Sequence, residues 1–581
     1  MPKGYPTDRI LKSNKKPDMR RLSPWTIPLA GLLSLGLTGV LANTQGPDPT
    51  WVAYYNGLGS GTDAGKAVAV DAAGNSYVTG YGFRRGAEMD FVTAKYDADG
   101  RRLWQAGFDG LTHHTDVPSA IALDGAGNVY VAGRSARGSG TSYDYVLLKY
   151  SAAGRLLWAK KRPGSPFIQS GGEYTPVHLA VDPAGNAYVS GYAPGGFRTT
   201  KYGPFGAELW SDAYGASEEQ PMVVPGFSQI ALSAVGGLLL AGGISYSPER
   251  SDVLVVRYSP SGERVLVLDR LSPNGVHAGA VAVAPEAGGG FSIAGVERQL
   301  PGGLADLLVA RFTADGTELW SRAYSRDAQS EDVPVALARD AGGDLVVTGS
   351  TQQPGQSGSA DLITLKYDSD GTLQWTSAYD GPLRGEDRAR VLGLDANGLI
   401  YVGATVDGGE ALNPNYALLK LSPAGDLLSA ACYDGPAGAV DDVAGMAVDG
   451  EGNATLTGIS AVSGNPVRGY NYGIGTVRYA GDAANAPTLL SVGLAGQQVR
   501  GKKAVQGLIR LTGEATTPTV VQLQSSHPEA LPVPVAGVAV RKGRATALFT
   551  LHSKRVTEPT EVTITATLAG VSKETVITVR P

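Results

Sequence analysis

The 581-residue sequence has a single cysteine, Cys432, and only six histidines. One thiol excludes an intrachain disulfide framework, a cysteine-rich zinc site and an iron-sulfur cluster held by thiolates. Charged residues make up 18% of the chain and hydrophobic residues 43%. Because this much apolar surface can offset the entropy of ordering the chain, we expect a folded protein rather than a disordered one.

Long helices also have little room. The sequence holds 80 glycines and 35 prolines, about a fifth of all residues against a usual share of roughly 12%. Residues that form turns and interrupt helices therefore recur at short intervals throughout the chain. This composition predicts an all-β protein.

The N-terminal segment differs from the rest. Seven basic residues precede an apolar run from Ile27 to Ala42, and this run is shorter than the roughly 20 residues of a membrane-spanning helix. We predict a signal peptide at residues 1–42, with Met19 as an alternative start, and hence a secreted, cell-surface or periplasmic protein without a transmembrane span in its mature form. An uncleaved membrane anchor is the alternative interpretation.

Removal of residues 1–42 leaves an acidic chain, with 42 Lys and Arg residues against 52 Asp and Glu residues. Phosphate backbones bind basic surfaces, so nucleic acid is not an expected partner. We expect a monomer without a cofactor.

Residues 51–480 consist of repeats of about 54 residues, eight in all. Each repeat has four short alternating runs separated by turn residues, which is the pattern of a four-stranded antiparallel sheet. A tryptophan marks the fourth run in six places: Trp51, Trp104, Trp158, Trp210, Trp320 and Trp375. The last repeat lacks its fourth run, whereas residues 51–57 are a fourth run on their own. Pairing of these two ends predicts an eight-bladed β-propeller closed by the N-terminal strand.

The motifs D-x-x-G-N-x-Y-V-T-G (71–80), D-F-x-T-x-K-Y (90–96) and G-x-x-L-W (100–104) resemble the bacterial SBBP-type β-propeller repeat of exported and cell-surface proteins. The resemblance covers residues 51–480 and implies fold and export rather than an activity. That family is named for seven blades, whereas counting the repeats gives eight. The G-x-x-x-W spacing is also similar to tryptophan-docking repeats, which implies that the tryptophan packs between blades.

Residues 488–581 contain seven β-rich runs separated by turn signals, which is typical of a β-sandwich. This segment resembles the cysteine-free Ig-like modules of bacterial surface proteins, and residues 481–487 are the expected linker. It lacks the cysteines and tryptophan of antibody domains, so the resemblance implies only the sandwich.

Several recurring residues have a structural interpretation. A Lys or Arg recurs near the end of the third run of all eight repeats, and we expect its stem to cover a neighbouring aromatic ring while its charged head stays in water. We interpret Cys432 as a buried thiol. Asp-rich turns such as YDADG (96–100) are explained as hairpin turns, and no metal site is predicted.

Five aspartates and one histidine lie where the chain enters the first run of a repeat. The simpler interpretation is that each carboxylate accepts backbone N–H bonds in the loop. The alternative is an incomplete acidic ring at the mouth of the axial channel, able to attract a cation or to work as acid and base. These channel-mouth candidates are Asp63, Asp116, Asp332, Asp387, Asp441 and His178.

Loop lengths separate the two faces of the predicted propeller. The turns after the first and third runs are short and uniform, whereas the loops after the second and fourth runs are long and different in every repeat. Function concentrates on variable loops carried by a regular scaffold. The candidates for ligand binding on this face are Arg84, Arg85, His113, His114, Phe167, Tyr174, Tyr246, Arg384 and Tyr470.

The residues contain no nucleophile elbow, phosphate-binding glycine loop or metal-binding helix motif. We therefore predict an exported, non-enzymatic binding or scaffold protein that presents its loop-rich face to a polysaccharide or protein. The alternative is a secreted hydrolase or lyase that uses carboxylates at the channel mouth.

Overall fold

The computed structural model describes residues 47–581 apart from several short gaps, so the predicted signal peptide lies outside the described residues. The gaps are 58–60, 84–87, 139–141, 165–176, 194–195, 216–223, 248–249, 271–276, 299–302, 328, 353–358, 410–412, 466–468, 482–488, 512–518, 535–536, 542–543 and 569–570. All regular elements of the described residues are β-strands, and none of these residues belongs to a helix that could cross a membrane.

Seven consecutive sheets each contain four antiparallel strands in chain order, which agrees with the predicted repeat. Sheets one to four are formed by β2 (Ala64–Val70), β3 (Ser76–Phe83), β4 (Met89–Tyr96) and β5 (Arg102–Phe108); β6 (Asp116–Leu123), β7 (Val129–Ala136), β8 (Tyr143–Tyr150) and β9 (Leu156–Pro163); β10 (His178–Val181), β11 (Ala187–Ala193), β12 (Gly196–Tyr202) and β13 (Glu208–Tyr214); and β14 (Val224–Leu232), β15 (Leu238–Ser247), β16 (Arg250–Tyr258) and β17 (Arg264–Arg270).

Sheets five to seven are formed by β18 (His277–Pro285), β19 (Phe291–Arg298), β20 (Ala305–Phe312) and β21 (Glu318–Tyr324); β22 (Glu331–Arg339), β23 (Leu345–Gln352), β24 (Asp361–Tyr367) and β25 (Leu373–Tyr379); and β26 (Arg388–Leu394), β27 (Ile400–Asp407), β28 (Pro414–Leu421) and β29 (Leu427–Tyr433). The fourth and fifth sheets share one parallel pairing, between Ser251 and His277.

The eighth sheet joins the two ends of the repeat region. It contains β30 (Asp441–Val448), β31 (Ala454–Asn465), β32 (Gly469–Tyr479) and the first strand of the chain, β1 (Trp51–Tyr55). β1 pairs antiparallel with β32, from Trp51 opposite Arg478 to Tyr55 opposite Ile474. The first strand therefore supplies the strand that the last repeat lacks.

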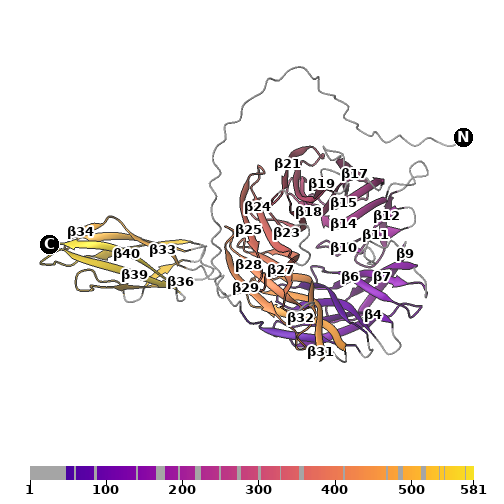
Figure 1. Ribbon diagram of the computed structural model, residues 1–581, viewed down its shortest axis with the longest axis horizontal. Helices are drawn as coiled ribbons and strands as arrows, with labels where there is room; N and C mark the ends of the chain where they lie inside the picture. The colour runs from indigo at the N-terminus through magenta and orange to yellow at the C-terminus, as the bar shows by residue number, and fades with distance from the viewer. Residues whose placement is uncertain are drawn as a thin grey trace, which may run out of the picture. The chain divides into compact units, whose positions relative to one another are not determined.

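The eight sheets follow one another as the blades of a β-propeller. The first strand of each sheet contacts the first strand of the next, and β30 in turn contacts β2. Figure 1 shows first strands such as β6, β10, β14 and β18 near a common centre and last strands such as β9, β17 and β29 at the rim. This order places the loops of all sheets on two opposite faces.

Tryptophans in the fourth strands contact the neighbouring sheets, as the resemblance to tryptophan-docking repeats implies. The indole N–H of Trp104 in β5 donates to the carbonyl of Ala152 at 3.0 Å, in the turn between β8 and β9 of the next sheet. In that turn Gly154 has φ +81°, and a Cβ there would lie 2.6 Å from the Trp104 ring. Glycine is therefore the only residue that fits both the turn and the ring. The same indole to carbonyl bond recurs at Trp51, Trp158, Trp210, Trp320 and Trp375.

The recurring basic residues are structural, but the prediction that their heads stay in water is wrong for five of them. Lys149 is 4% exposed, and its Nζ lies 3.2 Å from Asp124 and donates to the carbonyl of Pro204 in the next sheet. Its stem covers the ring of Tyr130, as predicted. The head is buried because the neighbouring sheet covers it. The other buried heads belong to Lys201, Lys366, Lys420 and Arg478.

The prediction for Cys432 is also wrong, because this residue is exposed. Side chains alternate along a strand, and in β29 it is Ala431 that points into the core.

Residues 489–580 form two further sheets. One contains β33 (Leu489–Leu494), β35 (Ala504–Leu511) and β38 (Thr546–His552), and the other contains β34 (Gln498–Arg500), β40 (Val571–Arg580), β39 (Thr560–Leu568), β36 (Thr519–Ser525) and β37 (Val538–Val540). Side chains of both sheets share one core, which includes Ile509 and Phe549 from the first sheet and Val562 and Ile577 from the second. Two sheets packed over a common apolar core form a sandwich.

Candidate functional site

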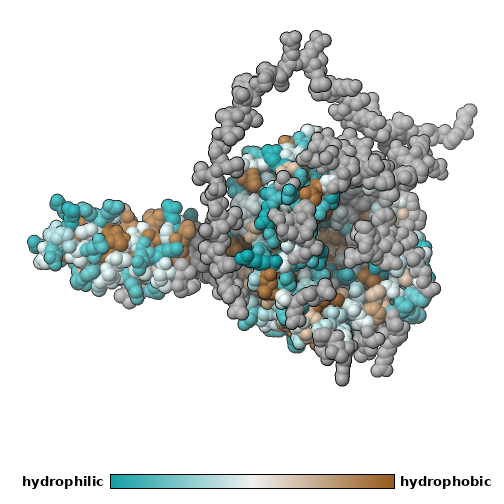
Figure 2. All heavy atoms as spheres, viewed as in Figure 1, coloured by the Kyte–Doolittle hydropathy of each residue, from teal (hydrophilic) through white to brown (hydrophobic). Residues whose placement is uncertain are grey.

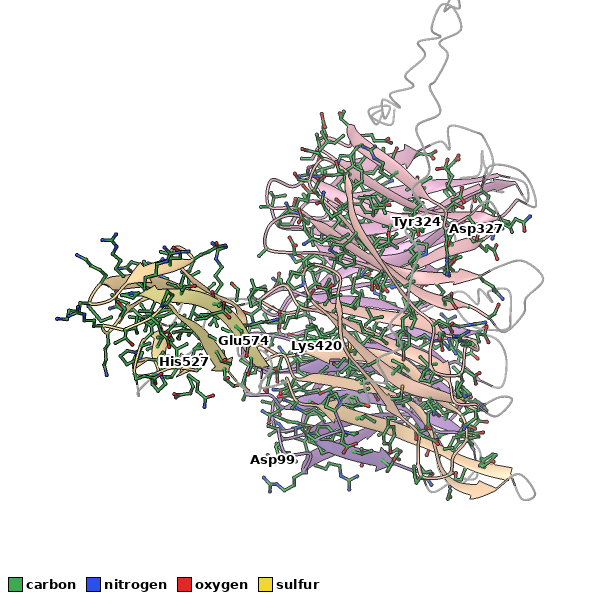
Figure 3. All side chains as sticks on the ribbon, turned by 60° about the vertical axis from the view of Figure 1, so that its left-hand side comes forward. Asp99, Tyr324, Asp327, Lys420, His527 and Glu574 are labelled. Carbon is green, nitrogen blue, oxygen red and sulfur yellow. The ribbon has the colours of Figure 1, made fainter. Side chains whose placement is uncertain are left out.

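The two faces of the propeller differ in their loops. On the short-turn face, first and third strands continue through five-residue turns held by backbone bonds, such as Asp71 N–H to the carbonyl of Asn75 at 3.0 Å. The long-loop face carries the loops after the second and fourth strands. Figure 3 shows Asp99, in a short turn, and Asp327, in a loop after a fourth strand, on opposite sides of the sheets. The turns after the first and third strands are short and uniform, as predicted. The loops after the second strands differ in length, as predicted, but they are not all long, because only two residues separate β11 from β12 and β15 from β16.

The five channel-mouth aspartates share one arrangement. Each carboxylate accepts a hydrogen bond from the backbone N–H six residues earlier, in the loop that connects two sheets. The pairs are Gly57 with Asp63, Gly110 with Asp116, Arg326 with Asp332, Gly381 with Asp387, and Gly435 with Asp441. All five aspartates are at most 1% exposed. The structure thus shows the backbone bonds of the simpler interpretation and places these carboxylates out of contact with solvent.

Burial changes the acidity of these groups. Desolvation raises the pKa of Asp387 and of Asp441 to about 6, against the lowering effect of the backbone hydrogen bonds that each accepts. Desolvation likewise raises the pKa of Asp63 and of Asp116. A buried charge is costly unless it is compensated, so these carboxyls hold a proton more readily than exposed ones.

The connecting loops that contain His113 and Arg384 have the same backbone. In each loop a turn is closed by an N–H to carbonyl bond, from His113 to Gly110 and from Arg384 to Gly381, and both residues have positive φ. The His113 side chain is 78% exposed and pairs with Asp109 at 2.8 Å. The Arg384 side chain is 71% exposed and lies 4.0 Å from Asp380. This backbone projects a polar side chain into solvent at the same place in two loops.

Three other candidates make contacts within the fold. His114 lies 3.6 Å from Glu88, and the ring of Tyr470 contacts that of Tyr472, with centroids 6.3 Å apart. His178 begins β10 and contacts the ring of Phe197. Four candidates, Arg84, Arg85, Phe167 and Tyr174, lie outside the described residues, as does the side chain of Tyr246.

Sequence reasoning missed one group of acidic residues. Oxygen atoms of Asp90, Asp109 and Asp116 all lie within 4.8 Å of one another. Asp90 is the second residue of β4, the third strand of the first sheet, whereas Asp109 and Asp116 bound the loop to the second sheet. The strand pairing that brings Asp90 beside this loop is not evident from any one motif. An aspartate does recur among the first three residues of the third strand, at Asp144, Asp252, Asp306 and Asp361.

Two cavities lie between neighbouring sheets, one beside Tyr145 and Tyr202 and one beside Tyr379 and Leu419. Each holds about 10 Å³, room for roughly one water molecule. A pocket for a drug-sized ligand is far larger, on the order of 300 Å³ or more. Neither cavity between these described residues can therefore hold a sugar residue.

No family model matches the chain, and a search of curated proteins found no relative. Among solved structures the chain is similar to the polysaccharide lyase Uly1, with 12% identity, 72% of this chain and 90% of that chain covered, and a TM-score of 0.39. It is similar to the β-propeller domain of the Trilobed protease from Pyrococcus furiosus, with 7% identity, 62% and 94% covered, and a TM-score of 0.35. A protein from Lactobacillus plantarum has 16% identity, 55% and 86% covered, and a TM-score of 0.36. Likenesses this distant carry no argument about activity or ligand.

Proposed function

We propose that the protein is an exported binding or scaffold protein without enzymatic activity. In this proposal, an eight-bladed propeller closed by β1 presents its long-loop face to a polysaccharide or protein, and an Ig-like sandwich follows it. The SBBP-type repeat resemblance and the predicted signal peptide support export.

The burial of the five aspartates carries this proposal. An acid and base pair must reach the substrate's reacting atoms, but Asp332 and Asp387 are 0% exposed and bind loop backbone instead. The loops closed by Asp116 and Asp387 expose His113 and Arg384. Carboxylates that order a loop and side chains that project from it favour recognition over turnover.

The described part of the surface favours an extended ligand over a small molecule. The two cavities described above are too small for one, and on the coloured part of the propeller in Figure 2 hydrophobic residues stand in small groups among polar ones. Exposed arginine and aromatic side chains are the usual anchors of such interfaces.

A glycan array and a panel of polysaccharide substrates test the proposal on the purified protein. We expect specific binding without turnover. Arg384→Ala should weaken binding by about tenfold, since an interface anchor contributes on the order of 1–2 kcal/mol. The matched control is Arg155→Ala, because Arg155 is exposed on the short-turn face, and it should bind as the wild type does.

Turnover of any substrate that is abolished by Asp332→Asn and by Asp387→Asn would overturn the proposal in favour of the hydrolase or lyase. Equal loss of binding in Arg384→Ala and Arg155→Ala would overturn the assignment of the long-loop face.

A further inference from the structure

Three carboxylates converge at the junction of the first and second sheets. Oxygens of Asp90, Asp109 and Asp116 lie within 4.8 Å of one another, and Asp90 and Asp116 are 4% and 0% exposed. Two oxygens bound to one calcium ion at about 2.4 Å each can be at most about 4.8 Å apart. The spacing is therefore compatible with three ligands around a single ion.

One oxygen of Asp116 has no hydrogen-bond partner. Its Oδ2 accepts the backbone N–H of Gly110, whereas its buried Oδ1 is unpartnered. A Cβ at Gly110 would lie 3.0 Å from this Oδ1, so glycine lets the carboxylate lie against the loop beside Asp109. A buried acceptor without a partner is costly, and a cation would satisfy it.

Two neighbouring side chains hold parts of this group in place. Lys161 in β9 is the basic group that acts electrostatically on Asp116, and its Nζ lies 3.3 Å from Ser135, the residue opposite Asp116. His113 orients Asp109 through a 2.8 Å contact between Nδ1 and Oδ2, as groups behind a metal ligand commonly do.

The aspartate equivalent to Asp90 in the sixth sheet pairs with an arginine. In the sixth sheet Asp361 occupies the position of Asp90, and the guanidinium of Arg326 lies 2.6 Å from it. The residue at the Arg326 position in the loop before β2 is Gly57, which has no side chain. The position that supplies the cation beside Asp361 is therefore a glycine in the loop before the first sheet.

We propose that Asp90, Asp109 and Asp116 bind one calcium ion that ties the first sheet to the loop entering the second. All three ligands are carboxylate oxygens, which calcium prefers, and water completes its coordination of six to eight oxygens. The ion holds the loop that projects His113, so it positions part of the long-loop face.

Isothermal titration of calcium chloride into the protein after treatment with EDTA tests this site. We expect one ion per chain with a Kd of about 10⁻⁴ M or tighter. Asp109→Asn should weaken binding by at least about tenfold. The matched control is Asp380→Asn, which changes the same position of the loop containing Arg384 and should leave calcium binding unchanged.

Asp90→Asn is a second test and should also weaken binding. Circular dichroism in EDTA checks that each variant is folded, and the partly exposed Asp109 is the safer substitution if Asp90→Asn does not fold. Calcium should raise the unfolding temperature of the wild type and of Asp380→Asn, but not that of Asp109→Asn. Absence of binding at about 10 mM calcium, well above the Kd of weak protein sites, would overturn the proposal and indicate a proton held among the carboxylates. Unchanged binding by Asp109→Asn, or equal loss in Asp380→Asn, would overturn it as well.

Discussion

Single residues decide how the connecting loops are ordered. A buried carboxylate that accepts an N–H bond from six residues earlier closes each of five loops, and glycine provides that N–H in four of them, at Gly57, Gly110, Gly381 and Gly435. At Gly381 a Cβ would lie 2.8 Å from the Asp387 carboxylate. The glycine therefore allows the carboxylate to reach the backbone.

Asp387 should make stability depend on pH. Its pKa is raised from 3.8 to about 6 in the folded protein, so the native state binds more protons than the unfolded state between about pH 4 and pH 6. The stabilisation is present below pH 4 and is lost as the pH rises through 6. Relative to Asp387→Asn, whose amide oxygen can still accept the Gly381 N–H, the wild type should lose on the order of 1–2 kcal/mol of unfolding free energy between pH 4.5 and pH 7.

Urea denaturation of both proteins at these two pH values measures this difference, and other titrating groups cancel in the comparison. Parallel pH dependence of wild type and Asp387→Asn would contradict the assignment of a raised pKa to this carboxyl.

At the scale of elements, the sheets are held together by the same few contacts repeated around the propeller. A fourth-strand tryptophan reaches the turn between the third and fourth strands of the next sheet, and a buried Lys or Arg on the third strand reaches a carbonyl or acid nearby. Arg478 in β32, for instance, lies 2.7 Å from Asp449 and donates to the carbonyl of Gly74 in the first sheet. The tryptophan bonds and the bond from Arg478 to Gly74 join two sheets, whereas the pair of Arg478 with Asp449 lies within one. Loss of a bond of the first kind therefore weakens a boundary between blades.

Gly154→Ala should weaken the boundary between the first and second sheets. Its φ is +81°, and a Cβ would lie 2.6 Å from the ring of Trp104. We expect a loss of about 1–3 kcal/mol of unfolding free energy, from backbone strain and displacement of the indole. Gly138→Ala is the control, since a Cβ at Gly138 meets no atom within 4 Å, and its effect should stay within about 0.5 kcal/mol. Chemical denaturation measures both, and equal effects would show that the clasp does not stabilise the boundary.

At the scale of the whole molecule, the two ends of the repeat region depend on each other. β1 covers the edge of β32 and places Trp51 on the turn of the first sheet, where its indole donates to the carbonyl of Ala98 at 2.9 Å. An uncovered strand edge is prone to pairing with other chains. One short strand thus protects the eighth sheet and also joins it to the first.

Deletion of residues 1–55 should therefore destabilise the propeller and promote aggregation. We expect a loss of about 3 kcal/mol or more, within the range of large single-site effects. Deletion of residues 1–46 alone, which retains β1, is the control and should leave the unfolding transition unchanged. Thermal unfolding and light scattering measure both truncations, and indistinguishable behaviour would mean that β1 does not hold the ends together.

The blade repeat could be predicted from the sequence because its marker residues recur at a regular spacing. The same features recur at a nearly constant interval: turn glycines such as Gly100, the tryptophans and the alternating strands. They recur because every blade needs the same turns and the same strand pairing. The lone fourth run at residues 51–57 therefore predicted the pairing of β1 with β32.

The burial of individual side chains and the approach of the three aspartates could not be predicted in this way, because they depend on how strands and sheets pack. The charged heads of Lys149 and Arg478 are buried because another sheet covers them. Cys432 is exposed because its side chain lies on the face of β29 that points away from the core. The meeting of Asp90 with Asp109 and Asp116 follows from the pairing of β4 with β5 and the course of the next loop. The spacing of residues within one repeat determines its turns and strand pairing. The burial of charged side chains and the convergence of carboxylates arise only when blades pack against one another.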